Sequence, residues 1–268
     1  MPYTDYADDT VNDQQFEQIY QVIRSDLTHG KAAEKEKCTI ILGGQPGSGK
    51  SSFYRMRDDL LNYIAINGDE YRRFHPNYQN IIKTDPEHYA ERTQKFSNRV
   101  VEKLITDLGS NGYNLIIEGT LRNPNVPINT CKYLQSQGYN PTLVVVACDA
   151  EKAWLSTLSR ASLLKSQGLA PRLVPIDVYD ITVNNIADSL QQIEESHCFA
   201  SITIINREGE ILYPDDSQNK ASDILSRALN LDNWRQKLPF YKKDFIQKKI
   251  AILQDALHQS DIDNDLER

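Results

Sequence analysis

Apolar residues recur along the chain at two spacings, one typical of buried strands and the other of amphipathic helices. The run 201–213 predicts a strand, or a hairpin that turns through Arg207, Glu208 and Gly209. Four earlier apolar runs, partly β-branched, predict further strands at 38–42, 62–69, 113–120 and 141–150. These runs are enough for one sizeable sheet.

Apolar residues three and four positions apart predict helices around these strands. One stripe predicts an N-terminal helix over 12–29: Phe16, Ile19, Tyr20, Ile23 and Leu27. A second stripe, from Phe96 to Leu108, predicts a long helix that stops at Gly109 or Gly112. Helical patterns also occur in the segment ending near Gly138, at 150–165, at 176–195 and from Asp223 onward.

Alternating strands and helices predict βαβ crossovers. We therefore expect an α/β fold with a mainly parallel sheet covered by helices on both faces. The segment 70–91 is polar and interrupted by proline, so it predicts an excursion over the surface.

One glycine-rich loop carries a specific chemical pattern. Residues 44–51 read GQPGSGKS and match G-x-x-x-x-G-K-[ST] at every fixed position. The loop follows the first predicted strand and precedes 51–61, which can continue as a helix. Glycines let backbone N–H groups close around phosphate oxygens, and the helix N-terminus adds its positive dipole end. A surface turn is the alternative.

The pattern therefore predicts a nucleotide-binding loop. We expect Lys50 to reach the β and γ phosphates and Ser51 to ligate Mg²⁺. The full set of expected nucleotide contacts is Gly44, Gln45, Pro46, Gly47, Ser48, Gly49, Lys50, Ser51 and Ser52. The simplest architecture is a P-loop kinase-like domain over 1–230, with helix 12–29 packed on it, followed by a charged helical extension over 231–268.

Composition limits the partners. The 268 residues carry a net charge of −7, which argues against nucleic acid or an anionic membrane as partner. The acidic, polar N-terminus does not resemble a signal peptide, and no apolar run approaches membrane-spanning length, so we expect a cytoplasmic protein. The four separated cysteines predict buried thiols rather than disulfides or metal ligands.

Three predicted strands end in acidic residues, where ligands of parallel sheets collect: Asp69, Glu118 and Asp149. Each could instead form a turn or a solvated strand end, and for Asp149 we favour capping of the next helix. Asp69 is the candidate acceptor of a substrate hydroxyl proton, with an ion pair to Arg72 or Arg73 as the competing role. Glu118 is the candidate second carboxylate near Mg²⁺, acting directly, through water or on substrate hydroxyls.

The stretch 151–175 is basic in an acidic chain. It carries Lys152, Arg160, Lys165 and Arg172 against Glu151 alone, a local charge of +3. This stretch follows the fourth predicted strand, where a lid would cover the phosphates. Its arginines could neutralise a transferring phosphoryl group, or they could form a solvated helix face.

The chain resembles the zeta toxin family of bacterial toxin–antitoxin systems over roughly residues 43–213. Four segments carry the resemblance: LGGQPGSGKSS (42–52), INGDEYRRFHPNY (66–78), GYNLIIEGTLRNPNVPINT (112–130), and the stretch from LSTLSRA through APR (155–172). The segment between Arg160 and Arg172 departs from the family pattern, because it is one residue shorter and carries Ser162, Leu163 and Leu164 where acidic and aromatic residues are usual.

The resemblance implies a kinase that uses ATP and Mg²⁺ to phosphorylate the 3′-hydroxyl of UDP-N-acetylglucosamine, and so blocks peptidoglycan precursor synthesis. It assigns Asp69 as base, and Lys50, Arg160 and Arg172 as the other catalytic residues. It also implies a cognate antitoxin as partner. The residues that it places on the sugar nucleotide are Glu102, Glu118, Thr120, Arg122 and Thr130.

Two alternatives remain open at the level of sequence. One is a P-loop kinase for another hydroxyl acceptor, and the acidic surface argues against a nucleic-acid end as that acceptor. The other is a nucleotide-dependent ATPase switch that controls a protein partner, which would give Asp69 no reason to follow the second strand.

Overall fold

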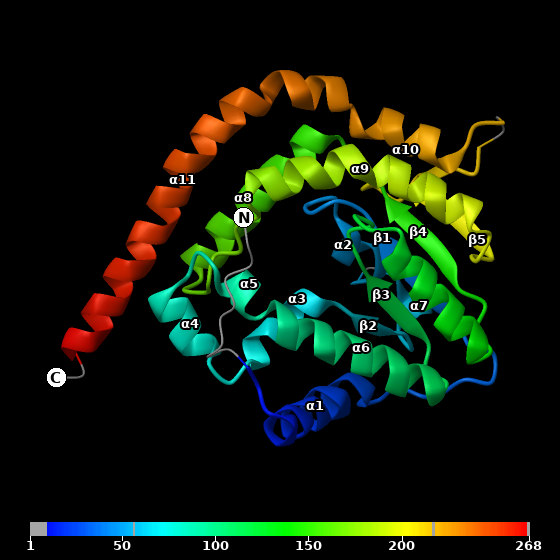
Figure 1. The fold of residues 1–268 in the computed structure, drawn as a ribbon, viewed down its shortest axis with the longest axis horizontal. Helices are drawn as coiled ribbons and strands as arrows, with labels where there is room; N and C mark the ends of the chain where they lie inside the picture. Colours follow the sequence, from blue (N-terminus) through cyan, green and yellow to red (C-terminus); the bar gives the residue numbers. More distant parts are fainter. Residues whose placement is uncertain (1–9, 56, 216–217, 267–268) are drawn as a thin grey trace.

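A six-stranded sheet in the order β2-β3-β1-β4-β5-β6 forms the centre of the molecule (Figure 1). The computed structural model describes residues 10–55, 57–215 and 218–266. Neighbouring strands are parallel except β6, which runs antiparallel to β5, so the hairpin at the end of the sheet is confirmed. The strands are β1 (Thr39–Gly43), β2 (Ile64–Ile66), β3 (Leu115–Glu118), β4 (Thr142–Val146), β5 (Ser201–Ile205) and β6 (Ile211–Tyr213).

Helices fill the intervals between the strands, as the sequence predicts for an α/β fold. The long helices are α1 (Asp13–Thr28), α6 (Gln94–Ser110), α7 (Asn125–Ser136), α8 (Ala150–Ser166), α9 (Ile176–Glu195), α10 (Ala221–Leu229) and α11 (Leu231–Leu266). The short ones are α2 (Lys50–Arg55), α3 (Gly68–Tyr71), α4 (Tyr78–Thr84), α5 (Tyr89–Arg92), and the 3₁₀ turns η2 (Asp58–Leu60) and η3 (Arg72–Phe74).

Both faces of the sheet are covered. On one face, Ile41, Leu143 and Ile117 belong to apolar clusters contributed by α1, α6, α7, α9 and α10. On the other face, Leu42 and Val144 pack with residues of α2 and η2. The alternation of Ile41 and Leu42 between the faces is the two-residue period of a strand.

The register brings the carboxyl ends of the parallel strands to one edge. Leu42 pairs with Glu118, Gly43 with Val145, and Ile66 with Ile117. The residues that follow β1, β2 and β3 therefore lie along the same edge of the sheet, which is where ligands of open α/β folds bind.

Two local predictions were wrong. Helix α2 ends at Arg55, and a separate 3₁₀ turn begins at Asp58, so the loop helix does not continue through residue 61. The segment 70–91 is not a surface excursion, because it forms short helices whose Tyr71 and Ile81 side chains are buried. Its apolar residues are too irregularly spaced for a periodic signal, and tertiary packing decides their burial.

The C-terminal helix α11 runs along α8 and α9 (Figure 1). Trp234 and Phe245 of α11 join Trp154 of α8 and Tyr179 of α9 in one aromatic cluster. Asn230 stands between α10 and α11 in the left-handed conformation, with φ 51°. Division of the chain into a domain and an extension at residue 230 stays a prediction.

The cysteines are free thiols, as expected, but Cys38 is exposed, and the prediction of burial was wrong for it. Cys38 precedes the first paired residue of β1, so its side chain lies outside the sheet. None of the helices in the described ranges combines the length and the apolar character that a membrane span needs. The N-terminal segment that we compared with a signal peptide lies largely outside the described residues, which begin at position 10.

Candidate active site

Two glycines of the loop after β1 stand where a side chain would clash with the backbone of β4 or α8. Gly44 and Gly47 have positive φ values of 143° and 78°. A Cβ atom on Gly44 would lie 2.7 Å from the Val146 carbonyl oxygen, and one on Gly47 would lie 2.1 Å from that of Ala153. The loop is therefore packed tightly between the end of β4 and the start of α8.

Lys50 lies inside this loop. Its ammonium donates hydrogen bonds to the carbonyl oxygens of Gly44 (2.6 Å) and Gln45 (3.0 Å). Burial lowers the pKa of Lys50 to about 8, the charge of Glu118 opposes the shift, and the charges of Arg160 and Arg172 add to it. The Lys50 ammonium thus shares one electrostatic environment with Glu118, Arg160 and Arg172.

The buried Gln45 side chain fixes the loop to the segment between β4 and α8, because its amide donates to the Cys148 carbonyl at 2.6 Å. Its own carbonyl oxygen and the Ser48 hydroxyl are buried without a hydrogen-bond partner. The loop pattern does not predict the hydrogen bond of Gln45 or the burial of the Ser48 hydroxyl, because positions 45 and 48 are variable in it.

Ser51, Tyr54 and Glu118 form a small oxygen-rich group. The Ser51 hydroxyl lies 3.3 Å from Glu118 Oε1, and the Tyr54 hydroxyl donates to the same oxygen at 2.6 Å. Burial, and then the Glu118 carboxylate, raises the pKa of Tyr54, so this hydroxyl stays a donor. A hydroxyl and a carboxylate are ligands that fit Mg²⁺. Sequence reasoning missed Tyr54, which stands one helical turn after Ser51 on α2.

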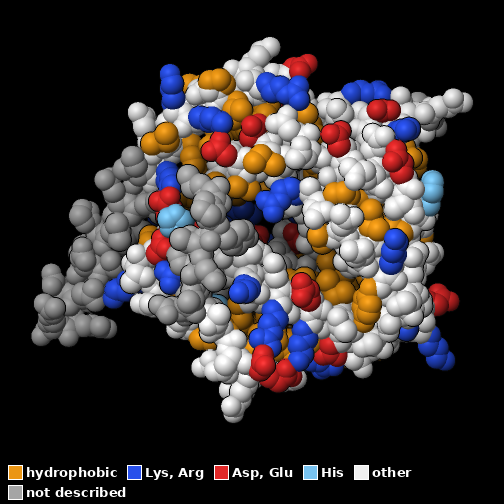
Figure 2. Space-filling model, viewed as in Figure 1, with side chains coloured by type: hydrophobic (Ala, Val, Ile, Leu, Met, Phe, Trp, Pro, Cys, Tyr) orange, Lys and Arg blue, Asp and Glu red, His pale blue; other side chains and the backbone are white. Residues whose placement is uncertain are grey.

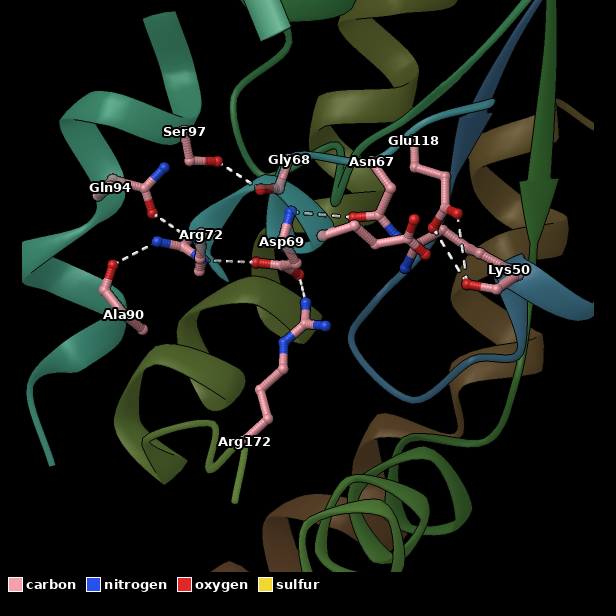
Figure 3. A network of polar contacts seen from close by, with 12 residues as sticks. Lys50, Asn67, Gly68, Asp69, Arg72, Ala90, Gln94, Ser97, Glu118 and Arg172 are labelled. Atoms are coloured by element: carbon pink, nitrogen blue, oxygen red, sulfur yellow. Dashed lines mark hydrogen bonds and ion pairs between the residues drawn. The ribbon is translucent and has the colours of Figure 1, made fainter. Parts of the chain in front are cut away.

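Asp69 is held by two arginines. Its backbone N–H donates to the Asn67 side chain at 3.1 Å, which starts α3 directly after β2. Arg72 Nε lies 3.1 Å from one carboxylate oxygen, and Arg172 forms an ion pair with the other (Figure 3). The ion pair with Arg72, which the sequence offered as the competing role of Asp69, is therefore present. Arg73 instead places its guanidinium over the Phe74 ring.

The buried Arg72 guanidinium connects Asp69 to α5 and α6. It donates to the Ala90 carbonyl, to the Thr93 hydroxyl (3.2 Å) and to the Gln94 side chain (2.6 Å). Desolvation lowers the pKa of Arg72, and these acceptors compensate for its burial. Arg72 orients the Asp69 carboxylate at the end of β2.

The two predicted lid arginines lie close to these groups. Desolvation lowers the pKa of Arg160, which stands on α8, and it lowers the pKa of Arg172 to about 10. The Glu118 charge acts on Arg160 in the opposite direction. Figure 2 shows a hollow near the centre of this face, with basic and acidic side chains around it.

The residues expected to contact a sugar nucleotide are less constrained. Glu102 on α6 is exposed, and so are Thr120 and Arg122 in the loop after β3. Thr130 is half-buried on α7, and its hydroxyl donates to the Val126 carbonyl at 2.9 Å. Glu118 is the member of this set that contacts the loop helix.

Leu121 explains how Thr120 and Arg122 are presented. It adopts φ 54°, which is uncommon for a branched residue, and its side chain is buried. A Cβ atom on Gly43 would lie 2.2 Å from Leu121 Cδ1, so glycine at position 43 makes room for this side chain. The neighbouring polar residues are left exposed beside the strand ends.

A further arginine reaches the loop from the β5–β6 turn. Arg207 Nε donates to the Ser48 carbonyl at 3.2 Å, and Nη2 donates to the Gly47 carbonyl and to the Ser156 hydroxyl, the latter at 2.8 Å. The sequence indicates Arg207 as a turn residue of the final hairpin, within a segment (205–213) that adds weaker support to the family resemblance, and it assigns this residue no role at the loop. No local signal connects it with a loop 159 positions earlier.

The chain is similar to known proteins. The family model of the zeta toxin matches residues 23–218. The toxin PezT of Streptococcus pneumoniae serotype 4 is 35% identical over 215 residues, covering 78% of this chain and 84% of the relative. The toxin zeta of Streptococcus pyogenes is 34% identical over 204 residues, covering 75% and 71%.

A solved structure from the PezAT chromosomal toxin–antitoxin system of S. pneumoniae is similar over most of its length. It superposes with a TM-score of 0.75 at 30% identity and covers 92% of this chain and 99% of its own. The match extends through the P-loop and the kinase-like sheet described above. The chain therefore belongs to the zeta toxin family, toxin–antitoxin proteins with a P-loop kinase-like fold.

Proposed function

We propose that this protein is an ATP-dependent kinase that phosphorylates the 3′-hydroxyl of UDP-N-acetylglucosamine. The observation that carries the proposal is the position of Arg172, which pairs with Asp69 and lies near enough to Lys50 to lower its pKa. Arg172 thus interacts with both Lys50, the candidate phosphate ligand, and Asp69, the candidate base. Phosphoryl transfer needs this combination of alignment and charge neutralisation.

In the proposed reaction, the acceptor hydroxyl oxygen forms a bond to the γ-phosphorus as the bond from that phosphorus to the ADP oxygen breaks. The hydroxyl proton passes to the Asp69 carboxylate, which Arg72 keeps oriented. Lys50, Arg160 and Arg172 balance the negative charge of the transferring group. The loop residues Gly44–Ser52 hold the remaining phosphates.

Ser51 and Glu118 would hold Mg²⁺, since a hydroxyl and a carboxylate are oxygen ligands that suit this ion and the two groups lie 3.3 Å apart. When bound, the metal would neutralise charge on the β and γ phosphates. Tyr54 holds the carboxylate toward Ser51 through its 2.6 Å hydrogen bond.

The acceptor is inferred from the family and from exposed polar residues on α6 and in the loop after β3. Glu102, Thr120 and Arg122 offer a carboxylate, a hydroxyl and a guanidinium, which suit sugar hydroxyls and a diphosphate. Phosphorylation would remove the precursor from peptidoglycan synthesis and arrest growth. Because the related S. pneumoniae structure comes from a toxin–antitoxin system, we also propose a cognate antitoxin as partner.

One experiment separates this proposal from its alternatives. Purified protein is incubated with ATP, Mg²⁺ and a panel of UDP-sugars, and the products are analysed by mass and by the position of phosphate. We expect phosphorylated UDP-N-acetylglucosamine, with a Lys50→Ala variant as the control for contaminating kinases. ATP hydrolysis that no sugar nucleotide accelerates would support the switch instead, and phosphate on another acceptor would correct the substrate.

A further inference from the structure

Arg207 makes three hydrogen bonds that join separate parts of the site. It belongs to the turn between β5 and β6, and its guanidinium bonds two consecutive carbonyls of the phosphate loop, at Gly47 and Ser48. The same guanidinium bonds the Ser156 hydroxyl of α8 at 2.8 Å. A cation from a distant turn therefore holds the backbone of the loop.

These bonds determine which way the loop N–H groups point. In a trans peptide the C=O and N–H directions are opposed, so a carbonyl held outward turns the next N–H inward. The outward Ser48 carbonyl thus directs the Gly49 N–H into the loop. The outward Gly47 carbonyl directs the Ser48 N–H inward, where it donates to the Gln45 carbonyl at 3.1 Å and closes the turn.

The packing around Gly49 agrees with this arrangement. Gly49 has φ 100°, which side chains rarely adopt, and a Cβ atom there would lie 3.5 Å from Arg207 Cγ. On the other side of the loop, the Ala153 carbonyl lies so close to Gly47 that a Cβ atom would clash. The loop is thus held between α8 and the aliphatic stem of Arg207.

Ser156 extends the connection to the lid. It stands one helical turn before Arg160 on α8, so the two side chains share a side of that helix. The guanidinium that fixes the loop carbonyls is therefore also bonded to the helix that carries a lid arginine. Movement of α8 relative to the loop has to break or shift the bond to Ser156.

We propose that Arg207 is a positioning residue that holds the phosphate loop in its anion-binding conformation and connects the loop to the lid helix. The role rests on the proposed function only in requiring that the loop bind the triphosphate of a nucleotide. Arg207 acts through the backbone of Gly47 and Ser48, not through the nucleobase or the acceptor.

The test compares binding of ATP and of inorganic tripolyphosphate, each with Mg²⁺, to wild type, Arg207→Ala, Arg207→Lys and Ser156→Ala. Glu208→Ala, an exposed neighbour in the same turn, is the matched control. We expect Arg207→Ala to weaken both ligands by about tenfold, as loss of charge-assisted hydrogen bonds does. Lysine should restore part of the affinity, Ser156→Ala should have a smaller effect, and Glu208→Ala should have none.

Steady-state kinetics adds a second measurement. The KM for ATP should rise in Arg207→Ala while the KM for the acceptor stays constant, and the thermal midpoint of Arg207→Lys and Ser156→Ala should stay near that of wild type. In an Arg207→Ala background, Ser156→Ala should cause no further loss.

Three results would overturn the proposal. One is unchanged affinity for both ligands in Arg207→Ala and Arg207→Lys. Another is a loss confined to ATP with tripolyphosphate unaffected, since that would place Arg207 on the nucleobase. The third is a wild-type protein that binds neither ligand. A wild type that binds both ligands but transfers no phosphoryl group would contradict the proposed kinase while leaving the role of Arg207 measurable.

Discussion

The proposed site has a donor half, the phosphate loop, and an acceptor half, the residues expected to contact the sugar nucleotide. The two halves differ in how firmly the rest of the protein holds them. The loop Gly44–Ser51 is fixed by packing against Val146 and Ala153. It is also fixed by the hydrogen bonds that Gln45 donates to the Cys148 carbonyl and Lys50 donates to the Gly44 carbonyl. Glu102, Thr120 and Arg122 are exposed instead. The donor half of the site is preorganised, whereas the acceptor half presents polar groups to solvent.

This difference has a physical origin. A loop that binds phosphate through backbone N–H groups must be rigid before the ligand arrives, because each N–H has to point at the same small volume. A sugar nucleotide is recognised by several separate side chains, and each can adjust its rotamer. We therefore expect substitutions in the donor half and at Asp69 to affect the rate strongly, and substitutions in the acceptor half to affect mainly KM.

The largest effect is expected at Asp69, where both halves meet. Asp69→Asn should lower the rate of transfer by about two to four orders of magnitude, because an amide cannot accept the hydroxyl proton. ATP affinity should be preserved. The measurement is kcat with the acceptor together with the Kd for ATP.

Asp149→Asn is the matched control for Asp69→Asn. Asp149 also follows a strand, but its carboxylate caps α8 by accepting from the Lys152 N–H at 3.1 Å, as the sequence predicts, and asparagine caps equally well. Wild-type turnover in Asp69→Asn would remove the assignment of this residue as base.

Substitution of Lys50 should have the second largest effect on the rate of transfer. Lys50→Ala should lower kcat by about two to three orders of magnitude, as removal of a group that stabilises transition-state charge does. Lys152→Ala, which removes an exposed lysine of α8, is the control. Growth arrest on expression should disappear with Lys50→Ala, and arrest that persists would show that toxicity does not depend on phosphoryl transfer.

The same lysine provides a test of preorganisation through stability. Because burial lowers the pKa of Lys50 from 10.5 to about 8, the charged form opposes folding at neutral pH. Lys50→Met should therefore raise the free energy of unfolding at pH 7 by about 1 to 3 kcal/mol.

The sign of the pH dependence follows from proton binding. Between about pH 8 and 10.5 the unfolded chain holds a proton at Lys50 that the native protein has released, so wild-type stability rises relative to Lys50→Met. Urea unfolding of both proteins at pH 7 and pH 10 measures the difference between their free energies of unfolding. This difference should be smaller at pH 10 than at pH 7. If this difference in the free energy of unfolding is the same at both pH values, burial does not destabilise the charged form of Lys50.

The smallest effect is expected in the acceptor half. Glu102→Gln should raise the KM for the UDP-sugar by about three- to tenfold and leave the KM for ATP unchanged, since an exposed hydrogen bond contributes little net free energy. Glu36→Gln, at another exposed position, is the control. An increase in the KM for ATP would place Glu102 on the donor side and weaken the comparison.

Most of the sheet and its helices could be predicted from periodicity, because strands such as 38–42 and helices such as 12–29 have continuous apolar patterns. The burial of Tyr71 and Ile81 could not, because their segment is broken into short helices. For the site, the loop pattern identified Lys50 and Ser51, and strand ends identified Asp69 and Glu118. The partners Tyr54 and Arg207 were missed, since a hydroxyl and a turn arginine carry no signal of what they touch.

The sequence by itself determined the phosphate loop, the alternation of strands and helices, and the family. These properties depend on residues adjacent in the chain, whose backbone preferences and spacing act locally. Only the tertiary structure decided that Arg72 and Arg172 share Asp69, and that Arg207 reaches a loop 159 residues earlier. Those contacts depend on the order β2-β3-β1-β4-β5, which places distant strand ends side by side and which no local pattern encodes.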